Sequence, residues 1–429
     1  MMDLKDIQLN REKMPTAITA NNHPIHKWYN FVAGYSPEYV YSTIKKFEGR
    51  TGYSPIRIYD PFAGCATTNV VANTMNIPSL GIERNPIFYK LGLAKVNAKT
   101  VVKYIAEIAE DFEATVNLNH CLQNIIKLPV DAEKFLSKLF IEESLEILLE
   151  LRNTVNDYVG DKNLAGFIFL SKVIDYVTHS KTDGIYKAPT SKKQYRTVLD
   201  SIRIVRDLFL EDISSINEHE NMCELKFASS VDYPVESESL DLVVFSPPYL
   251  NNFDFAEMTR MQMYFWGEAG SWKEISDKHR NHMIVNTTTA LKLVRKQESQ
   301  DVLAQKLPPS LQKLLQPIVA ELKTIKKTKP SKKDYDLIIY PYLAQMKEVL
   351  THCYNGLRKN GEIHIVVSDA AFYGIHIDTQ EFLAEILKDI GFRDVSVDQM
   401  RARGERWILE KRKSSGKQLG EYEITGVKE

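Results

Sequence analysis

Cysteine is scarce in this chain of 429 residues. Cys65, Cys121, Cys223 and Cys353 form no CxxC pair, and no histidine stands beside them at zinc-finger spacing. The sequence therefore indicates neither a disulfide framework nor a metal site. Such cysteine usage fits a protein of a reducing compartment.

Long apolar runs are missing as well. No stretch approaches the ~18–20 consecutive apolar residues that a membrane span needs. The opening MMDLKDIQLNREK also lacks the apolar region of a signal peptide. We therefore expect a cytoplasmic protein with no membrane contact. Its length predicts one large core with insertions, or two domains.

An excess of either charge is absent, because the formal net charge is −1 and the pI is about 6.8. A polyanionic partner would have to meet local basic clusters. A basic and aromatic loop is predicted from Ser180 to Val198, either solvated or in contact with a polyanion. Two further clusters comprise Lys323, Lys326, Lys327, Lys329, Lys332 and Lys333, and Arg401, Arg403, Arg406, Lys411, Arg412, Lys413 and Lys417.

One short motif ends an apolar strand abruptly. The run LDLVVF from Leu240 leads into Ser246-Pro247-Pro248-Tyr249. Two successive prolines remove two backbone donors, so no strand ladder continues through them. A strand ending there presents a hydroxyl, rigid carbonyls and an aromatic ring at its carboxyl edge, which is the edge where open α/β sheets bind ligands.

A second ligand-type edge lies earlier in the chain. A short strand ending at Asp60 runs into the turn PFAGCATT and then into a helical pattern. The next strand, from Ser79, ends in Glu83, 23 positions after Asp60. This spacing is typical of nucleotide-binding βαβ units, in which the acid binds a ribose. The series predicts a site for a nucleoside-like cofactor.

The order of elements predicts an α/β fold. Strands are expected near Leu225 to Ala228 and from Glu362 to Ser368, with helices over YPYLAQMKEVLTHCYNGL and from Thr379 to Ile390. This alternation favours a doubly wound, mostly parallel sheet. Segments 395–397 and 407–409 are expected to form a final antiparallel pair, and the stretch from Pro86 to about Asn221 is expected to be helical.

These motifs carry a family resemblance. DPFAGCATT, LGIERNP and SPPYLNNFDF resemble, in that order, the cofactor loop, acidic strand end and catalytic tetrapeptide of the S-adenosylmethionine-dependent DNA amino-methyltransferases. HKWYNFVAGYSPEYV resembles their extra cofactor-side motif, and RKNGEIHIVVSDAAFYG their fifth-strand region. The resemblance spans roughly Ile25–Asn97, Leu225–Gly267 and Tyr335–Lys411. It implies a Rossmann-like methyltransferase sheet with an antiparallel final strand. The fold is expected to carry two insertions, which the resemblance does not explain.

The resemblance also implies roles for single residues. S-adenosyl-L-methionine would be the cofactor, and double-stranded DNA the substrate. Ala66 departs from the pattern, because the family's loop usually ends in a second glycine there. Asn251 and Asp254 either orient the catalytic corner or cap the following helix. The implied catalytic residues are Ser246, Pro247, Pro248 and Tyr249, and the implied cofactor-binding residues are Phe31, Asp60, Phe62, Gly64, Glu83 and Asp232.

The chemistry of amino methylation fits this corner. The Ser246 hydroxyl and the Pro247 carbonyl can accept the amino hydrogens, so that the nitrogen lone pair points at the sulfonium methyl. The face of Tyr249 can stack on a flipped base. No cysteine follows a proline, which excludes attack at pyrimidine carbon 5. Serine at the first catalytic position favours cytosine N4 over adenine N6.

Several alternatives stay open. RNA base methyltransferases have a similar arrangement of motifs, and a catalytically silent DNA-binding subunit could retain the fold. Phe31 could serve core packing alone, and Asp232 could be a loop cap. A cognate restriction endonuclease is a possible partner.

We divide the chain at the motifs and insertions. The second insertion is our candidate for target recognition, because it follows the corner and ends in lysines that can neutralise phosphates. The expected parts are 1–100 and 222–267 of the methyltransferase core, a helical insertion at 101–221, the second insertion at 268–333, and the remaining core at 334–429.

Overall fold

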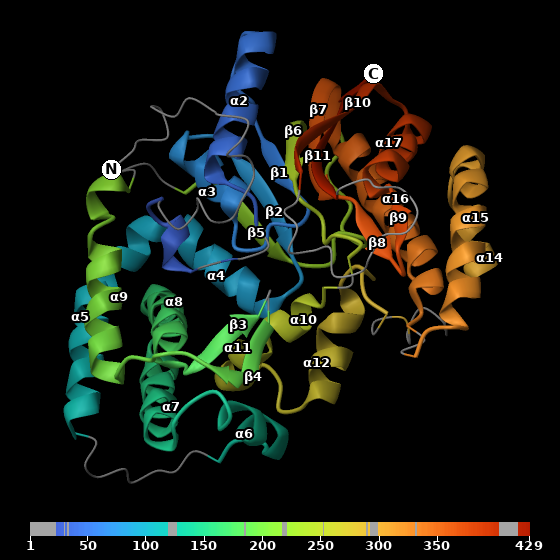
Figure 1. Cartoon of the computed structure of the whole chain (residues 1–429). Helices are drawn as coiled ribbons and strands as arrows, with labels where there is room; N and C mark the ends of the chain where they lie inside the picture. The colour runs from blue at the N-terminus through green and yellow to red at the C-terminus, as the bar shows by residue number, and fades with distance from the viewer. Residues whose placement is uncertain are drawn as a thin grey trace.

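A seven-stranded sheet runs through the middle of the computed structural model (Figure 1). The structure describes residues 23–29, 31, 34–118, 127–183, 186–216, 221–251, 253–288, 291, 299–330, 333–402 and 419–429. Across the sheet the strands lie in the order β10 (Phe392–Ala402), β11 (Gly420–Lys428), β7 (Leu357–Ser368), β6 (Leu240–Phe245), β1 (Ile58–Asp60), β2 (Ser79–Glu83) and β5 (Cys223–Phe227).

Five neighbouring strands, from β7 to β5, pair in parallel, whereas β11 is antiparallel to both β7 and β10. The predicted doubly wound, mostly parallel sheet with an antiparallel final strand is therefore confirmed. The predicted partner of residues 395–397 was wrong: Ser396 and Val397 pair with Thr425 and Ile424 of β11. Residues 407–409 lie outside the described part of the chain.

Side chains that alternate along the central strands pack into two separate cores, one on each face of the sheet. Ile58, Leu242 and Val244 pack under α2 (Pro37–Thr51) and α3 (Thr67–Thr74) on one face. Tyr59 and Phe245 point to the opposite face, where α16 (Ile339–Gly356) and α17 (Thr379–Ile390) lie. The fully buried pattern of β6 follows from this double cover.

The stretch after β2 is helical, as predicted, with one exception. Residues 180–198, expected as a loop, contain an antiparallel hairpin of β3 (Ser180–Asp183) and β4 (Tyr186–Lys192). The expectation missed it because the strand residues are mostly polar and do not alternate. The helices of this stretch are α4 (Pro86–Val96), α5 (Ala98–Leu118), α6 (Val130–Leu136), α7 (Glu142–Asp157), α8 (Gly160–Val177), α9 (Val198–Leu210) and η4 (Ile213–Ser215).

Asp212, at the end of this helical stretch, anchors the first described residues. Its Oδ2 accepts hydrogen bonds from the Ile25 backbone N–H and the Trp28 indole N–H, both at 2.8 Å. Its Oδ1 lies 2.8 Å from the Lys27 ammonium. The carboxylate is fully buried, so these contacts compensate its desolvation. They hold η3 (His26–Trp28), and with it the approach to Phe31, against the helical stretch.

Helices also fill the segment that follows the catalytic corner. The first lysines of the predicted basic cluster, near 323–327, lie at the end of a regular helix, because α15 continues to Lys326. Beyond it, residues 331 and 332 are outside the described part of the chain. The elements here are α10 (Phe255–Met258), α11 (Arg260–Trp266), α12 (Trp272–Lys278), η5 (Arg280–His282), α14 (Gln300–Gln305), α15 (Pro309–Lys326) and η6 (Tyr335–Leu337).

The last helices end close to where the sequence predicts. Gly391 closes α17 in the left-handed region, at φ 116°. The predicted strand start at Glu362 was late, because β7 already begins at Leu357, directly after α16. A short hairpin, β8 (Ala370–Phe372) with β9 (Ile375–Ile377), follows β7. Within the described residues, no helix is long and apolar enough to cross a membrane.

Candidate active site

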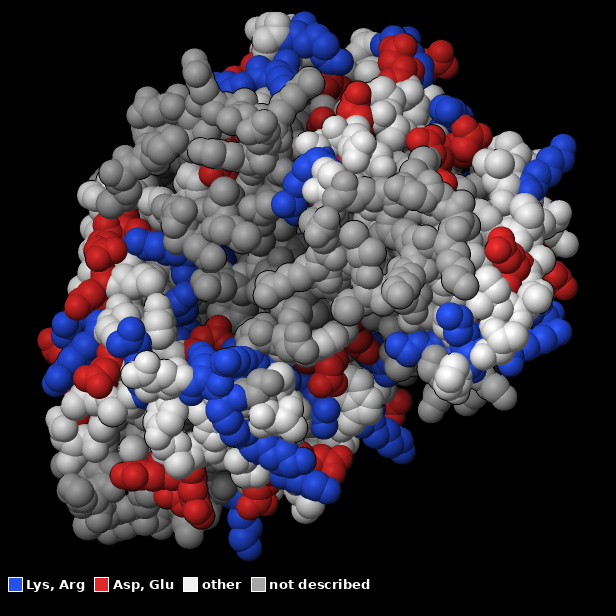
Figure 2. Space-filling view, viewed as in Figure 1, with Lys and Arg blue, Asp and Glu red and all other residues white. Residues whose placement is uncertain are grey.

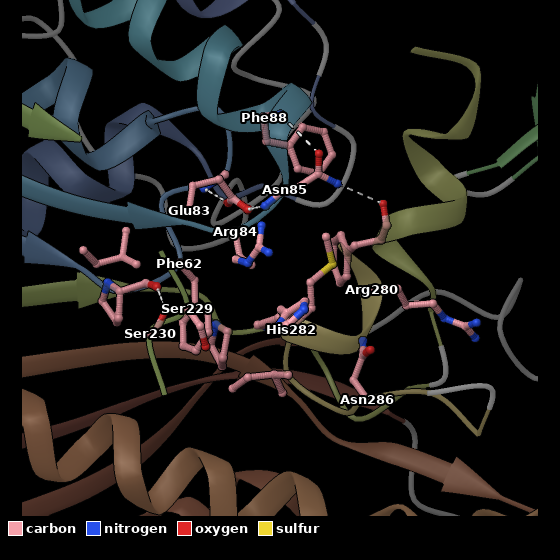
Figure 3. Close-up of a pocket in the computed structure, with 18 of the residues that line it drawn as sticks. Phe62, Glu83, Arg84, Asn85, Phe88, Ser229, Ser230, Arg280, His282 and Asn286 are labelled. Atoms are coloured by element: carbon pink, nitrogen blue, oxygen red, sulfur yellow. Dashed lines mark hydrogen bonds between the residues drawn. The ribbon is translucent and has the colours of Figure 1, made fainter. Parts of the chain in front are cut away.

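One cavity lies at the carboxyl ends of β1, β2 and β6 (Figure 3). Ser229 and Ser230 lie on one side of it, and Asn286 and Arg280 on the other. The lining thus combines the cofactor turn, the catalytic corner and the segment after α12. Its residues are Phe31, Pro61, Phe62, Gly64, Ile82, Glu83, Arg84, Asn85, Phe88, Ser229, Ser230, Ser246, Pro247, Pro248, Asp254, Phe255, Arg280, His282, Met283, Ile284, Asn286 and Thr287.

Gly64 allows an aromatic ring to close over the cofactor turn. Its φ is +53°, and a Cβ added to it would lie 3.0 Å from the Phe31 ring. Phe31 in turn meets Phe88 edge to face, with ring centroids 4.7 Å apart. A side chain at position 64 would be strained and would displace Phe31. The turn therefore keeps its backbone accessible from the cavity beside an apolar wall.

The Glu83 carboxylate is held at the end of β2 by two backbone donors. Gly64 N–H donates to one oxygen at 2.8 Å, and Asn85 N–H donates to the other at 2.6 Å. Burial nevertheless raises the pKa of Glu83 to about 7, against the opposing effect of these hydrogen bonds. Each carboxylate oxygen has two lone pairs, so it can still accept a hydroxyl from the cavity. This donor and acceptor set fits the ribose of a nucleoside cofactor.

Asp60 does not line the cavity, although the sequence predicts a contact with the cofactor. Its buried carboxylate accepts hydrogen bonds from Phe62 N–H at 2.9 Å, Tyr35 O–H at 2.9 Å and Thr68 O–H at 2.7 Å. Burial raises the pKa of Asp60 to about 6, while these hydrogen bonds oppose that shift. In this arrangement Asp60 orients the turn that carries Phe62.

Ala66 occupies the position where the resembling family usually has glycine. Its φ is +64°, in the left-handed region, and the residue is fully buried. This costs an L-residue roughly 1–2 kcal/mol. The methyl group points at Gly92 of α4, where an added Cβ would lie 3.1 Å from it. Ala66 does not line the cavity, so its methyl group leaves the cofactor side of the turn clear.

The catalytic corner presents the Ser246 hydroxyl to the cavity. The hydroxyl donates to the phenolic oxygen of Tyr249 at 3.3 Å. Donation in that direction leaves the lone pairs of Ser246 Oγ to accept hydrogens from a substrate. Pro247 is buried behind it, which fixes the backbone of the corner.

Two asparagines brace the corner from neighbouring elements. The Asn286 amide donates to the carbonyls of Tyr249 and Phe253, at 3.2 and 2.8 Å. Asn85 caps α4 with its side-chain oxygen, while its amide nitrogen donates to Thr259 Oγ1 at 2.8 Å. The end of β2 and the segment after Ser246–Tyr249 are thereby held together.

Asp254 links the corner to the hairpin. Its side chain caps α10 through Ala256 N–H, and it lies 2.9 Å from the Arg280 guanidinium. Its own backbone N–H donates to the Tyr186 hydroxyl of β4 at 2.7 Å. Asn251 accepts from the Phe253 N–H at 3.2 Å. Both roles considered for Asp254, capping and bracing, are thus present in one residue.

Most of the predicted site residues meet in this cavity. Tyr249 is half-buried beside Ser246 without lining the cavity, and Asp232 lies exposed on a loop outside it. Their predicted contacts with base and adenine stay predictions. The predicted residues that line the cavity are Phe31, Phe62, Gly64, Glu83, Ser246, Pro247 and Pro248.

Sequence reasoning missed several lining residues. The Asn85-Pro86 pair directly after a strand is a helix-start signal that points to the bracing role of Asn85. Phe255, Met283 and Asn286 carry no such signal, because long-range packing alone brings them to the cavity.

Neither a thiol nucleophile nor a metal centre is indicated. Burial raises the pKa of Cys65 to about 12, so the thiol in the cofactor turn stays protonated. Among the described residues, no group of three or more His, Cys, Asp or Glu side chains could hold a metal ion.

The sheet and its cavity define a Rossmann-like α/β fold with a ligand site at the carboxyl edge of the strands, and comparison with known proteins indicates its class. No family model matches the chain. The type II methyltransferase M.BsoBI of Geobacillus stearothermophilus is 21% identical over 446 residues, covering 94% of this chain and 83% of its own. The type II methyltransferase M.AvaI of a Nostoc species is 22% identical over 411 residues, covering 86% and 79%. The chain is thus similar to type II methyltransferases over most of its length.

A solved structure, the rRNA methyltransferase aviRa from Streptomyces viridochromogenes, aligns with 79% of this chain and 78% of its own at 9% identity. Its TM-score is 0.25, which is too low to carry an argument.

Proposed function

We propose that the chain is a site-specific DNA methyltransferase that moves a methyl group from S-adenosylmethionine to the exocyclic amino group of a flipped base. One observation carries this proposal: the turn with Gly64 and Glu83 and the corner with Ser246 line the same cavity. A donor held at the first and an amine held at the second would meet there. Double-stranded DNA is the proposed substrate, inside the cytoplasm.

The cofactor supplies an activated methyl group, so this chain's residues mainly have to bind and orient. Glu83 would accept the ribose hydroxyls, since its oxygens already lie at the cavity end of β2. Phe31 and Phe62 would provide apolar contact. The missing side chain at Gly64 leaves room for the Phe31 ring beside the turn.

Amino transfer requires that the nitrogen lone pair leave the ring plane and point at the methyl group. Ser246 Oγ and the Pro247 carbonyl would accept the two amino hydrogens, and the two prolines would keep these acceptors rigid. A flipped base recovers part of its unstacking cost from aromatic contact, about 1–3 kcal/mol per ring. Tyr249 is the proposed ring.

Cytosine N4 is the preferred target over adenine N6. Serine at the first catalytic position supports this choice, through the resemblance to cytosine-N4 enzymes. Because the relatives are type II methyltransferases, we extend the proposal to restriction-modification with a cognate endonuclease.

A radiolabel assay from S-adenosylmethionine to duplex DNA tests the proposal, and nuclease digestion followed by mass spectrometry identifies the modified base. We expect N4-methylcytosine. Tritium in transfer RNA, with none in DNA, would redirect the assignment to RNA. Absence of cofactor binding in calorimetry would indicate a silent subunit of the same fold.

A further inference from the structure

We propose that the β3–β4 hairpin and the residues after it, up to Arg196, dock the phosphate backbone of duplex DNA beside the active site. This docking surface rests on the proposed function and names the element that meets the substrate. Where the sequence predicted a loop, the structure has a two-stranded antiparallel ribbon. The major groove of DNA is wide enough to admit such a ribbon.

The docking surface concentrates positive charge on a nearly neutral protein. Residues 180–196 contain five Lys or Arg side chains and a single acid, whereas the whole chain has a net charge of −1. Lys181, Lys192 and Arg196 are exposed. Lys181 and Arg196 form no ion pair with any described residue, so their charges are available to phosphates. Figure 2 shows Lys and Arg gathered over this region, below the hollowed centre of the face.

The hairpin is anchored by its other lysines. Lys187 lies 3.0 Å from the Asp175 carboxylate of α8, and Lys193 donates to the Asp175 carbonyl at 2.9 Å. Two of the five cations are thus used internally to fix the ribbon against α8. A fixed ribbon loses little conformational freedom when it binds, which favours docking.

Tyr186 connects this surface to the reacting centre. Its hydroxyl accepts the backbone N–H of Asp254 at 2.7 Å, and Asp254 lines the cavity. In the hairpin register Lys181 faces Ala188, two residues from Tyr186. Side chains two apart on a strand share a face, so Lys181 lies on the face that meets the catalytic corner. Phosphates held there would flank the base that enters the cavity.

The lysines of α15 are the rival surface, as the sequence alone favoured. They are less suitable because Lys326 is neutralised by Asp334 and Asp336. Figure 1 also places α15 at the outer side of the molecule, beyond α16 and α17 and away from the hairpin and α10. Lys323 and Lys327 remain exposed on it and form no ion pair with a described residue, so they serve as a matched control.

The test compares two double variants of the full chain, Lys181→Gln with Arg196→Gln and Lys323→Gln with Lys327→Gln. Each removes two exposed positive charges. Affinity for a fluorescein-labelled duplex is measured by anisotropy over a range of salt concentrations. We expect the hairpin variant to bind at least about tenfold more weakly at low salt, and its log–log salt slope to fall by about 1.8.

The control variant, Lys323→Gln with Lys327→Gln, should keep the duplex affinity and the salt slope of the wild-type protein. Wild-type slope and affinity in the hairpin variant would overturn the docking surface, and so would an equal loss in the α15 variant. Thermal denaturation shows whether each variant is folded. If the double variant is unstable, the single substitution Lys181→Gln is measured in its place, and half the decrease in salt slope is expected. Calorimetric cofactor binding and methyl transfer by the wild-type protein report separately on the proposed function. Their failure would remove that function, whatever the duplex result.

Discussion

Ser246 is the residue on which the proposed chemistry depends most directly. Its hydroxyl lies at the end of a fully buried strand and is fixed by two prolines and by contact with Tyr249. In the proposed function, this hydroxyl and the Pro247 carbonyl are the two groups that accept the amino hydrogens. The corner therefore combines a small functional group with an unusually rigid support.

Ser246→Ala is expected to reduce methyl transfer by roughly a hundredfold or more, since one preorganised polar contact is lost in the transition state. Cofactor affinity should stay unchanged, because the proposed role of Ser246 is to contact the base and not the cofactor. Tritium transfer and calorimetry measure the two effects. Tyr249→Phe, which retains the ring, is the milder companion. Full activity in Ser246→Ala would be incompatible with the proposed role.

If Glu83 holds the ribose as proposed, its raised pKa should make cofactor binding dependent on pH. Its raised pKa, about 7, means that the free protein carries much of it protonated near neutrality. The carboxylate accepts ribose hydroxyls better than the acid does, so binding favours ionisation and releases a proton. We expect affinity to rise between about pH 6 and 8 and then to level off. Calorimetry in buffers of different ionisation enthalpy measures the proton release.

In Glu83→Gln the affinity should be lower and nearly independent of pH over the same range. The same raised pKa opposes folding of the ionised form, so this group's contribution to the stability of the free protein is greatest in acid. It is lost as pH rises from the unfolded value, about 4.5, through 7. A pH profile of affinity that persists in Glu83→Gln would assign the titration to another group.

At the scale of elements, local signals predicted those strands that end in turns. Ser79–Glu83 matches β2 at both ends, and the apolar run from Leu240 matches β6 to within one residue. Pairings that join distant parts of the chain were missed. The partner of β10 lies beyond 402, and no local pattern marks it, because β11 mixes polar and apolar residues. The hairpin at β3–β4 escaped for the same reason.

The site shows the same division. Glu83, Gly64 and Ser246 stand in local motifs whose chemistry can be read directly. Asn286 reaches the corner through two hydrogen bonds and Tyr186 through one, both from segments that are remote in sequence. Their importance depends on tertiary placement, which composition and spacing do not encode.

Tyr186→Phe tests the link between the hairpin and the corner. It removes the hydroxyl that accepts the Asp254 N–H and leaves the ring in place. We expect kcat to fall several-fold, with duplex affinity and cofactor affinity near wild type, because the corner loses one brace while no charge changes. A matched control is Tyr195→Phe, an exposed tyrosine just after the hairpin. Equal kcat in both variants would argue against a positioning role.

The whole molecule depends on β11. This strand pairs with β7 on one side and β10 on the other, so β10 has no other partner in the sheet, and β7 would keep only its parallel ladder with β6. Ile424 of β11 is fully buried, in the core covered by α16 and α17. A sheet without β11 would expose two unpaired edges, which are templates for aggregation.

Removal of residues 419–429 is expected to abolish the soluble monomer. Size-exclusion chromatography should show aggregates, and cofactor binding should be lost with the fold. Removal of Glu429 alone, an exposed residue beyond the strand, should have no effect. A monomeric, cofactor-binding protein after the longer deletion would show that β7 and β10 can close without their partner.

The contact between Asp212 and Ile25 can form only late in the synthesis of the chain. It joins residues 187 positions apart. At ~5–20 residues per second on the ribosome, roughly ten to forty seconds separate the two. Until then the segment leading to Phe31 relies on contacts made by earlier residues, such as those from the Lys95 ammonium to the carbonyls of His26 and Tyr29. The wall that Phe31 forms beside the cavity therefore gains its anchor at Asp212 only after most of the helical stretch has been synthesised.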